Sequence, residues 1–313
     1  MKAIYIDETG GPDVLKYGEV PEPEAAPGHT LVKVAASGVN FIDTYYRGGL
    51  YKIPLPAVLG SEGAGTVVKT GERVAWAMSR GSYAEFASVP ETLLVPLPDG
   101  VSFEEGAAAI LQGMTAHYLA YSTFPLKKGD TALIHAAAGG TGLLLVQIAK
   151  LLGARVIGTV GTEVKAQLAH EAGADETIVY TAQDFVAETR KLTDGKGVDV
   201  VYDSVGKDTL LKSLDCLRPR GLAVSFGQSS GAVPPFEPLL LSQKGSLFFT
   251  RPALPQYIAD RKELEWRAGD VFRWIATKQL HLRVQPPYSL KDAAQAHRDL
   301  EGRKTTGKLV IVI

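Results

Sequence analysis

The chain has 313 residues, of which 45% are hydrophobic and 21% are charged. This length and composition suit one or two domains with sizeable cores. The 33 basic and 34 acidic residues nearly balance, which argues against a nucleic-acid surface or an acidic-membrane surface. The single cysteine, Cys216, excludes an internal disulfide, and no apolar stretch has the length of a membrane span or signal peptide. We therefore expect a cytoplasmic protein.

Residues 1 to about 110 are predicted to be mostly β. Short alternating runs at 31–34, 65–68 and 73–76 are separated by Pro and Gly, a spacing typical of a barrel-like or folded antiparallel sheet. The segment 36–51 is different, because its three tyrosines, Asn, Asp and Arg are more polar and aromatic than a core requires.

A helical pattern replaces the β pattern from Ser102 to Tyr121. Ser102 and Glu105 have the spacing of a capping box, in which each side chain accepts a hydrogen bond from the other residue's backbone N–H. We therefore expect a helix to begin directly after Ser102.

The stretch from Thr131 to Gly142 predicts a strand, a tight loop and the start of a helix. The loop has the pattern A-x-G-x-x-G across Ala137, Gly139 and Gly142. A loop of small residues lets backbone N–H groups approach a pyrophosphate, and the helix N-terminus adds partial positive charge. Glycines also serve ordinary turns, but the strand before and the helix after favour a dinucleotide site here.

Strands and helices alternate after Gly129, which indicates a parallel sheet covered on both faces. The predicted strands are 131–136, 155–160, 177–180, 198–202, 222–226 and 246–250, with helices at about 142–152, 163–172, 184–193 and 207–217. Six strands match a doubly wound Rossmann domain. The tail departs from this alternation, with a helix at about 261–279, a strand near 281–285, a helix at 290–301 and a strand at 308–313. We expect the tail to complete the first domain.

The residues after the second Rossmann strand bear on the choice of cofactor. In NAD-preferring sites an acid ends that strand and binds the ribose hydroxyls. Here Gly161 and Thr162 leave room, and Lys165 follows one helical turn later. A lysine can neutralise a 2′-phosphate as a point charge, so the pattern favours NADPH. Two alternatives remain: Glu163 could be the ribose acid, and Lys165 could be an ordinary solvated lysine.

Several motifs together resemble the medium-chain dehydrogenase/reductase superfamily. They are the Gly loop, Gly60-Ser61-Glu62-Gly63-Ala64-Gly65, Gly71-Glu72-Arg73-Val74 and Gly81-Ser82-Tyr83-Ala84-Glu85-Phe86. More narrowly, the chain is similar to the zeta-crystallin-type NADPH:quinone oxidoreductases in the segments 40–45, 201–206, 225–227 and 243–247. The resemblance covers essentially the whole chain. It implies a GroES-like, mostly β catalytic domain at 1–111 and 252–313, and a Rossmann domain at 112–251.

The resemblance does not extend to the zinc sites of this superfamily. Zinc alcohol dehydrogenases have a histidine where this chain has Ser61, and they use cysteine ligands at both a catalytic and a structural site. One cysteine cannot build either site from thiolates, so we expect no metal in the protein.

The resemblance also implies roles for individual residues. The cofactor residues would be Ala138, Gly139, Gly140 and Thr141 at the pyrophosphate, Gly161, Lys165, Tyr180 and Arg303 at the 2′-phosphate, and Phe226, Gly227, Ser229, Phe249 and Thr250 at the nicotinamide. The substrate cleft would be lined by Asn40, Asp43, Tyr45, Tyr51 and Thr115. A homodimer would form through the last Rossmann strand, near 246–250, which agrees with an apolar edge that would otherwise stay exposed.

The implied activity is NADPH-dependent reduction of a quinone, by transfer from the nicotinamide to an acceptor in the interdomain cleft. A quinone needs little acid assistance, which agrees with the lack of an evident catalytic histidine. Tyr45 and Tyr51 could donate hydrogen bonds to a quinone oxygen, stack on its ring, or simply be core tyrosines.

Two other functions stay open at this point. One is reduction of the activated double bond of an alkenal or enone, for which the acceptor would occupy the same place. The other is a cofactor-binding protein with an RNA-binding or structural role. The balanced charge and the lack of a basic run with interleaved aromatics argue against RNA.

Overall fold

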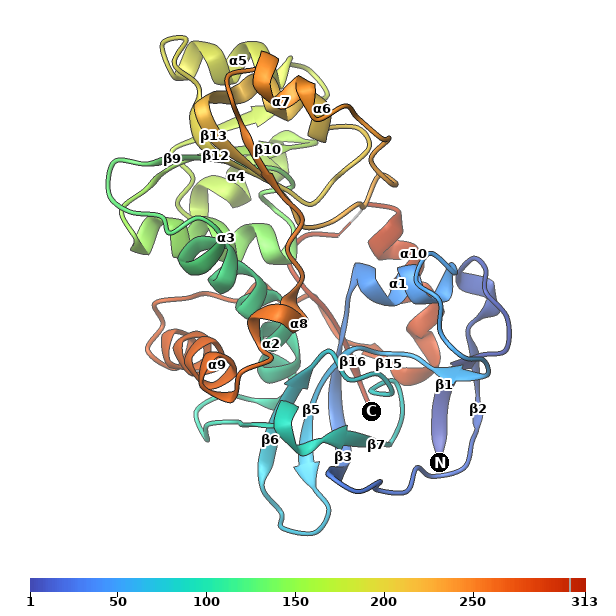
Figure 1. Ribbon diagram of the computed structural model, residues 1–313. Helices are drawn as coiled ribbons and strands as arrows, with labels where there is room; N and C mark the ends of the chain where they lie inside the picture. Colours follow the sequence, from blue (N-terminus) through green and yellow to red (C-terminus); the bar gives the residue numbers. More distant parts are fainter. Residues whose placement is uncertain (304) are drawn as a thin grey trace. The chain divides into compact units, whose positions relative to one another are not determined.

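The computed structural model describes residues 1–303 and 305–313. The chain forms two compact units. The first contains Met1–Met114 and Tyr257–Ile313, and the second contains Thr115–Gln256. The C-terminal tail is thus part of the same unit as the N-terminal strands (Figure 1).

The first unit is built mainly from strands, in two sheets. A small sheet has the order β2-β1-β4, and a seven-stranded sheet has the order β15-β16-β3-β5-β6-β8, with β7 also paired to β3. The strands are β1 (Lys2–Ile6), β2 (Lys16–Glu19), β3 (His29–Val39), β4 (Ala57–Val58), β5 (Glu62–Val67), β6 (Arg73–Ala77), β7 (Phe86–Pro90), β8 (Val95–Pro96), β15 (Tyr288–Ser289) and β16 (Leu309–Val312). The long strand β3 is antiparallel to β5, β7 and β16, so it joins the C-terminal strand to the centre of the sheet. This agrees with the antiparallel sheet expected for this part of the chain.

The helices of this unit are α1 (Phe41–Arg47), α9 (Arg261–Ala276) and α10 (Ala293–Glu301). Two more helices cross the boundary between the units: α2 (Phe103–Tyr118) begins in the first unit, and α8 (Leu254–Tyr257) ends in it. The predicted capping box is confirmed at the start of α2. The Ser102 backbone N–H donates to Glu105 Oε2 over 2.8 Å, and the Glu105 N–H donates to Ser102 Oγ over 3.1 Å.

Two features of the first unit differ from the sequence-based expectation. Residues 281–285 do not form a strand: only Val284 makes an isolated bridge, to Lys308. The consecutive prolines Pro286 and Pro287 lack backbone N–H groups, which limits strand pairing there. The unusual segment 36–51 contains the short helix α1, which its clustered aromatic and β-branched residues did not suggest.

The second unit contains a six-stranded parallel sheet. Its order is β11-β10-β9-β12-β13-β14, and every pair in it is parallel. In Figure 1 β9, β10, β12 and β13 lie side by side. The strands are β9 (Thr131–Ile134), β10 (Arg155–Val160), β11 (Glu176–Val179), β12 (Val198–Asp203), β13 (Leu217–Ser225) and β14 (Phe248–Thr250). Counted along the chain this is the order 3-2-1-4-5-6 of the doubly wound fold, which confirms the predicted fold class.

The helices of the second unit are α3 (Gly140–Leu151), α4 (Glu163–Glu171), α5 (Phe185–Leu192), α6 (Leu210–Ser213) and α7 (Leu239–Gln243). The helix expected over 207–217 is shorter: after α6 the chain tightens into a 3₁₀ turn and enters β13 at Leu217. Cys216 lies in this turn and is fully buried among apolar side chains. Burial raises the pKa of its thiol to about 12, as expected for a structural cysteine.

Candidate functional site

The Gly loop joins β9 to α3 by a turn that leaves no room for larger residues. Ala136 has a left-handed backbone with φ of 51°. A Cβ added to Gly142 would lie 2.2 Å from the carbonyl oxygen of Ala136, which is backbone and cannot move aside. A Cβ on Gly158 of the neighbouring strand would lie 2.8 Å from the Ala137 Cβ. The loop, β10 and the start of α3 therefore pack at the close distance that a dinucleotide-binding turn requires.

The residues predicted to hold a pyrophosphate all lie in this turn. Ala138 is buried, Gly139 is the N-cap of α3, and Gly140 and Thr141 lie in the first turn of α3. The first N–H groups of a helix have no intrahelical acceptor, and the helix dipole places partial positive charge at the same end. The turn can thus receive a phosphate on backbone donors alone.

A second group forms where β10 ends. Tyr180 donates its backbone N–H to the carbonyl oxygen of Val160, and its hydroxyl would be 3.0 Å from a Cβ placed on Gly161. Thr162 caps α4 by accepting the Lys165 backbone N–H over 3.3 Å. Gly161 and Tyr180 thus lie side by side, and Lys165 lies in the first turn of the helix that follows Gly161.

Two further residues bear on this group. Glu163 is exposed in the first turn of α4, the same turn that carries Lys165. Arg303, the fourth residue expected at the 2′-phosphate, belongs to the first unit, where it is exposed directly after α10.

The ends of β12 and β13 bring together three of the residues predicted at the nicotinamide. The Phe226 N–H donates to the carbonyl oxygen of Asp203 over 2.8 Å, and the Ser229 N–H donates to that of Ser204 over 3.1 Å. A Cβ on Gly227 would lie 2.7 Å from the Ser204 oxygen, so the two loops touch at backbone distance.

The other two nicotinamide residues and one substrate residue also belong to the second unit. Phe249 and Thr250 lie in β14, in register with Ala223 and Val224 of β13. Thr115, expected in the substrate cleft, lies in α2 and is nearly buried.

A buried network behind the Gly loop was not expected from the sequence. Asp203 Oδ1 accepts the N–H groups of Val205 and Gly206, each over 2.8 Å, and thereby shapes the loop after β12. His135 Nδ1 lies 2.8 Å from Thr159 Oγ1, and its Nε2 lies 2.8 Å from Ser213 Oγ. Burial lowers the pKa of His135, which keeps it neutral. In the sequence, only the position of Asp203 at the end of a predicted strand pointed to this network.

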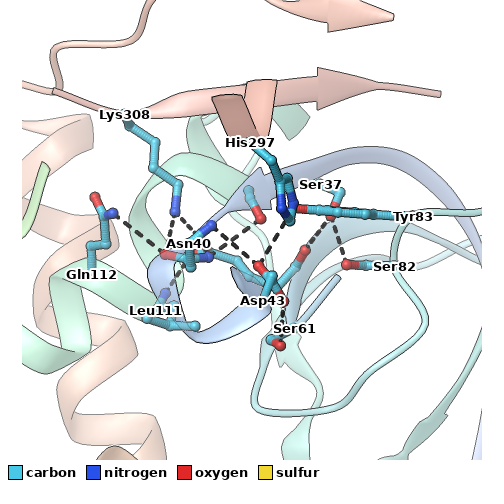
Figure 2. Close-up of polar contacts among 12 residues, drawn as sticks. Ser37, Asn40, Asp43, Ser61, Ser82, Tyr83, Leu111, Gln112, His297 and Lys308 are labelled. Carbon is cyan, nitrogen blue, oxygen red and sulfur yellow. Dashed lines mark hydrogen bonds and ion pairs between the residues drawn. The ribbon is translucent and has the colours of Figure 1, made fainter. Parts of the chain in front are cut away.

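The first unit holds a second buried network, around the start of α1 (Figure 2). Glu62 is fully buried; its Oε1 accepts the Leu111 N–H over 2.5 Å. Its Oε2 accepts from Lys308 Nζ over 2.5 Å and from Asn40 Nδ2 over 2.8 Å. Lys308 also donates to Asn40 Oδ1 over 2.7 Å. Gln112 Nε2 approaches the same Asn40 oxygen at 3.4 Å. Asn40, a predicted site residue, is thus held on both ends of its amide.

Asp43 belongs to the same network and is fully buried. Its Oδ1 accepts from Ser61 Oγ over 2.6 Å, and its Oδ2 accepts the Asn40 N–H over 3.2 Å and the Tyr83 hydroxyl over 3.4 Å. Burial raises the pKa of Asp43 to about 7, although the hydrogen bond from Ser61 and the charge of Lys308 oppose the shift.

A chain of partners continues from Asp43 through Tyr83 to His297. The Tyr83 oxygen lies 3.2 Å from His297 Nε2, and His297 Nδ1 lies 3.0 Å from Arg47 Nη1. Arg47 also binds Glu301 through two nitrogens, over 3.0 and 2.7 Å. A guanidinium can only donate, so Nδ1 is the acceptor and the Nε2–H of His297 donates to Tyr83. Burial and the Arg47 charge lower the pKa of His297 to about 3.

The two predicted tyrosines lie close together. The ring centroids of Tyr45 and Tyr51 are 5.5 Å apart in an edge-to-face arrangement, and the Tyr51 N–H donates to the Tyr45 carbonyl oxygen over 3.1 Å. Both side chains are half-buried. The structure therefore brings Asn40, Asp43, Tyr45 and Tyr51 into one region of the first unit, on and just after α1.

Four residues of this region were missed by sequence reasoning: Glu62, Tyr83, His297 and Lys308. Glu62 and Tyr83 stand inside motifs noted for resemblance alone. His297 and Lys308 follow these motifs by more than 200 positions. The pairing of β16 with β3 brings Lys308 to the site, and contact between α10 and α1 brings His297 to it.

Among residues 1–303 and 305–313, no three His, Cys, Asp or Glu side chains are grouped closely enough to hold a metal ion. Within the same residues, no helix combines the length and the apolar character needed to cross a membrane.

Comparison with known proteins places these features in a family. Residues 26–99 match the alcohol dehydrogenase GroES-like domain, and residues 140–259 match the zinc-binding dehydrogenase domain. The quinone oxidoreductase of Pseudomonas aeruginosa is 46% identical over 99% of this chain and 99% of its own. The chain belongs to the quinone oxidoreductase family, within the medium-chain dehydrogenase/reductase superfamily. The resemblance inferred from the motifs is therefore confirmed at that level.

Two further relatives bear on function. The crystal structure of Escherichia coli quinone oxidoreductase complexed with NADPH matches with a TM-score of 0.98 and 44% identity, over all of both chains. A 2-haloacrylate reductase of a Burkholderia species is 42% identical over 100% of this chain and 99% of its own. The relatives thus include proteins named for quinones and one named for 2-haloacrylate.

Proposed function

We propose that this protein is an NADPH:quinone oxidoreductase that works without zinc. The observation that carries the proposal is the full-length match to a quinone oxidoreductase complexed with NADPH, together with a Gly loop whose geometry admits no larger residue at Gly142. The electron acceptor is a quinone or a similar small electrophile.

The residues present fit NADPH. The turn at Ala138–Thr141 supplies backbone donors for the pyrophosphate, and Lys165 supplies a cation one turn after the small residue Gly161. When bound, NADPH supplies the hydride. The chain would bind and orient it: Phe226, Gly227, Ser229, Phe249 and Thr250 at the nicotinamide end, and Tyr180 and Arg303 at the 2′-phosphate.

The residues proposed for the acceptor divide into two kinds. Tyr45 and Tyr51 are half-buried and can present a hydroxyl or a ring face to a quinone. Asn40 and Asp43 are buried and fully bonded, so we assign them to holding α1 rather than to direct contact. Thr115, in α2, is also proposed to line the acceptor site. Tyr45→Phe should lower kcat with little change in NADPH affinity; unchanged turnover would remove its role.

The deciding experiment measures NADPH and NADH oxidation by metal-free protein with a panel of quinones and a panel of alkenals. Quinone turnover that favours NADPH is the expected result. Lys165→Met should raise the KM for NADPH at least about tenfold and leave that for NADH nearly unchanged, because a charge-assisted phosphate contact is lost. Lys191→Met, at an exposed position of the same unit, is the matched control. Equal loss for both cofactors would contradict the assignment of Lys165.

A second candidate function is reduction of activated double bonds. The similarity to the 2-haloacrylate reductase favours it specifically. A preference for alkenals or haloacrylates in the same panel would establish it on the same cofactor site. NADPH binding without turnover of any acceptor would point instead to a cofactor-binding protein, and a salt-sensitive RNA shift would revive an RNA-binding role.

We also propose a homodimer formed through β14. This strand ends the order of the six-stranded sheet, and Phe248 on it is 62% exposed. An apolar edge strand of this kind is normally covered. Sedimentation should give a dimer, and Phe248→Asp should give a monomer; a wild-type monomer would overturn the proposal. A cytoplasmic location stays a prediction.

A further inference from the structure

Lys308 is an unusual residue for its position, because its side chain is only 3% exposed and lies beside a carboxylate that is fully buried. It lies directly before β16 and donates to Glu62 of β5 and to Asn40 at the start of α1. Figure 2 shows Lys308 pointing toward Asn40. Burying an ion pair costs desolvation free energy that a pair of apolar residues would not incur. Stability alone therefore gives no reason for a buried ion pair here.

The contacts of Lys308 fix which way the Asn40 amide points. An ammonium group only donates, so the atom facing Lys308 Nζ at 2.7 Å must be the amide oxygen of Asn40. The amide nitrogen then faces Glu62 Oε2 at 2.8 Å, where it finds an acceptor. The reversed amide would set two donors against each other and two acceptors against each other. No third orientation satisfies both neighbours.

The backbone just before Asn40 is also packed tightly against Glu62. A Cβ on Gly38 would lie 2.2 Å from Glu62 Oε2 and 2.4 Å from the backbone oxygen of Ala107. The backbone before Asn40 thus packs directly on the Glu62 carboxylate. The charged or titratable groups that act on Lys308 are Glu62, in direct contact, and Asp43, at longer range.

We propose that Lys308 is a positioning residue: it locks the Asn40 amide and thereby fixes the N-terminus of α1, the helix that carries Tyr45. The inference rests on the proposed function, because it assigns Lys308 a part in presenting the acceptor-binding residues. Lys308 itself touches neither acceptor nor cofactor. Its effect passes through Asn40. Substitutions at both positions can therefore distinguish a positioning role of Lys308 from a merely structural one.

A double-mutant cycle tests this route. The variants are Lys308→Met, Asn40→Ala and both together, and kcat is expressed per NADPH-binding site so that unfolded protein does not count. Lys308→Met should lower kcat about 10- to 100-fold, as expected when reacting groups lose alignment, with the Kd for NADPH within about twofold of wild type. Because both act through one amide, the double variant should be no slower than Asn40→Ala alone.

Two additional variants guard against loss of the fold. Lys308→Met leaves Glu62 buried without its cation, which can unfold the protein. The pair Lys308→Met with Glu62→Gln removes both charges and should recover the melting temperature but not kcat. Lys291→Met, at an exposed lysine of the same unit, should leave both unchanged. Two outcomes would overturn the proposal. One is that the effects of Lys308→Met and Asn40→Ala on kcat multiply in the double variant, and the other is that Lys308→Met with Glu62→Gln recovers kcat per site together with stability.

Hydrogen exchange gives a readout that does not depend on turnover. Peptides covering residues 38–47 should exchange at least about tenfold faster in Lys308→Met with Glu62→Gln than in wild type, because the start of α1 opens locally. If wild type reduces no quinone, the proposed function fails, and this measurement still decides whether Lys308 holds α1. Unchanged exchange in these peptides would refute the positioning role by itself.

Discussion

Asp43 and His297 should give opposite contributions to the pH dependence of stability. The pKa of Asp43 is about 7 in the folded protein, and an unfolded Asp has a pKa near 4, so between these values only the folded state holds the proton. The contribution of Asp43 to the free energy of unfolding therefore falls as the pH rises through that range. The pKa of His297 is about 3 when folded, so between about pH 3 and 6.5 only the unfolded state binds its proton, and its contribution rises with pH.

The size of each effect follows from one proton. Each group changes the free energy of unfolding by about 1.4 kcal/mol per pH unit while its two states differ by a full proton. Between pH 4.5 and 6 the two slopes nearly cancel in wild type. Asp43→Asn should therefore gain about 2 kcal/mol relative to wild type from pH 4.5 to 6, and His297→Gln should lose about 2 kcal/mol over the same interval.

Urea unfolding followed by tryptophan fluorescence at several pH values measures these slopes. The informative quantity is the difference between variant and wild type at each pH, which cancels the titration of all other groups. Gln279→Ala, at an exposed position of the same unit, removes no titratable group and should show no slope in this difference. Differences that are flat, or that slope the same way for both variants, would refute the assignment of a protonated Asp43 beside a neutral His297.

Two further predictions come from local packing. Gly142→Ala should lower the free energy of unfolding by about 1–3 kcal/mol and abolish NADPH binding, because its Cβ meets backbone atoms. Gly269→Ala, with open space in α9, should instead raise the free energy of unfolding by about 1 kcal/mol. Urea unfolding and NADPH fluorescence titration measure both, and wild-type affinity in Gly142→Ala would contradict the account of the loop. Ser102→Ala should cost about 1 kcal/mol in the same unfolding assay, because the capping box of α2 loses one bond; an unchanged midpoint would show the bond to be dispensable.

The Rossmann unit was largely predictable because its signals are local. Apolar strand runs, the Gly loop and the alternation of strands with helices each lie within a few residues of one another, and together they determined the six-stranded parallel sheet. The predicted ends of helices and strands were less accurate where a helix passes gradually into a strand. The helix expected over 207–217 tightens into a 3₁₀ turn, since Leu217 must already begin β13.

The first unit was harder to predict because its site is assembled from distant segments. The polar and aromatic segment 36–51 attracted notice, but neither its helix nor the partners of Asn40 and Asp43 could be derived from it. The partners of Asn40 come from β5, from α2 and from the tail, and those of Asp43 include Ser61 and Tyr83. Nothing in the local sequence distinguishes Lys308 from a surface lysine. Only the antiparallel pairing of β16 with β3 brings it against Glu62.

The two buried histidines, His135 and His297, each connect two elements by hydrogen bonds from both ring nitrogens. His135 bonds hydroxyl groups on both sides, Thr159 at Nδ1 and Ser213 at Nε2, each of which can donate or accept. Arg47 can only donate, so it fixes the tautomer of His297. Each ring is neutral and serves as a donor on one side and an acceptor on the other. A neutral ring with both nitrogens bonded joins two elements without a buried charge, so strand ends and loops keep one arrangement at lower desolvation cost than an ion pair such as Lys308–Glu62.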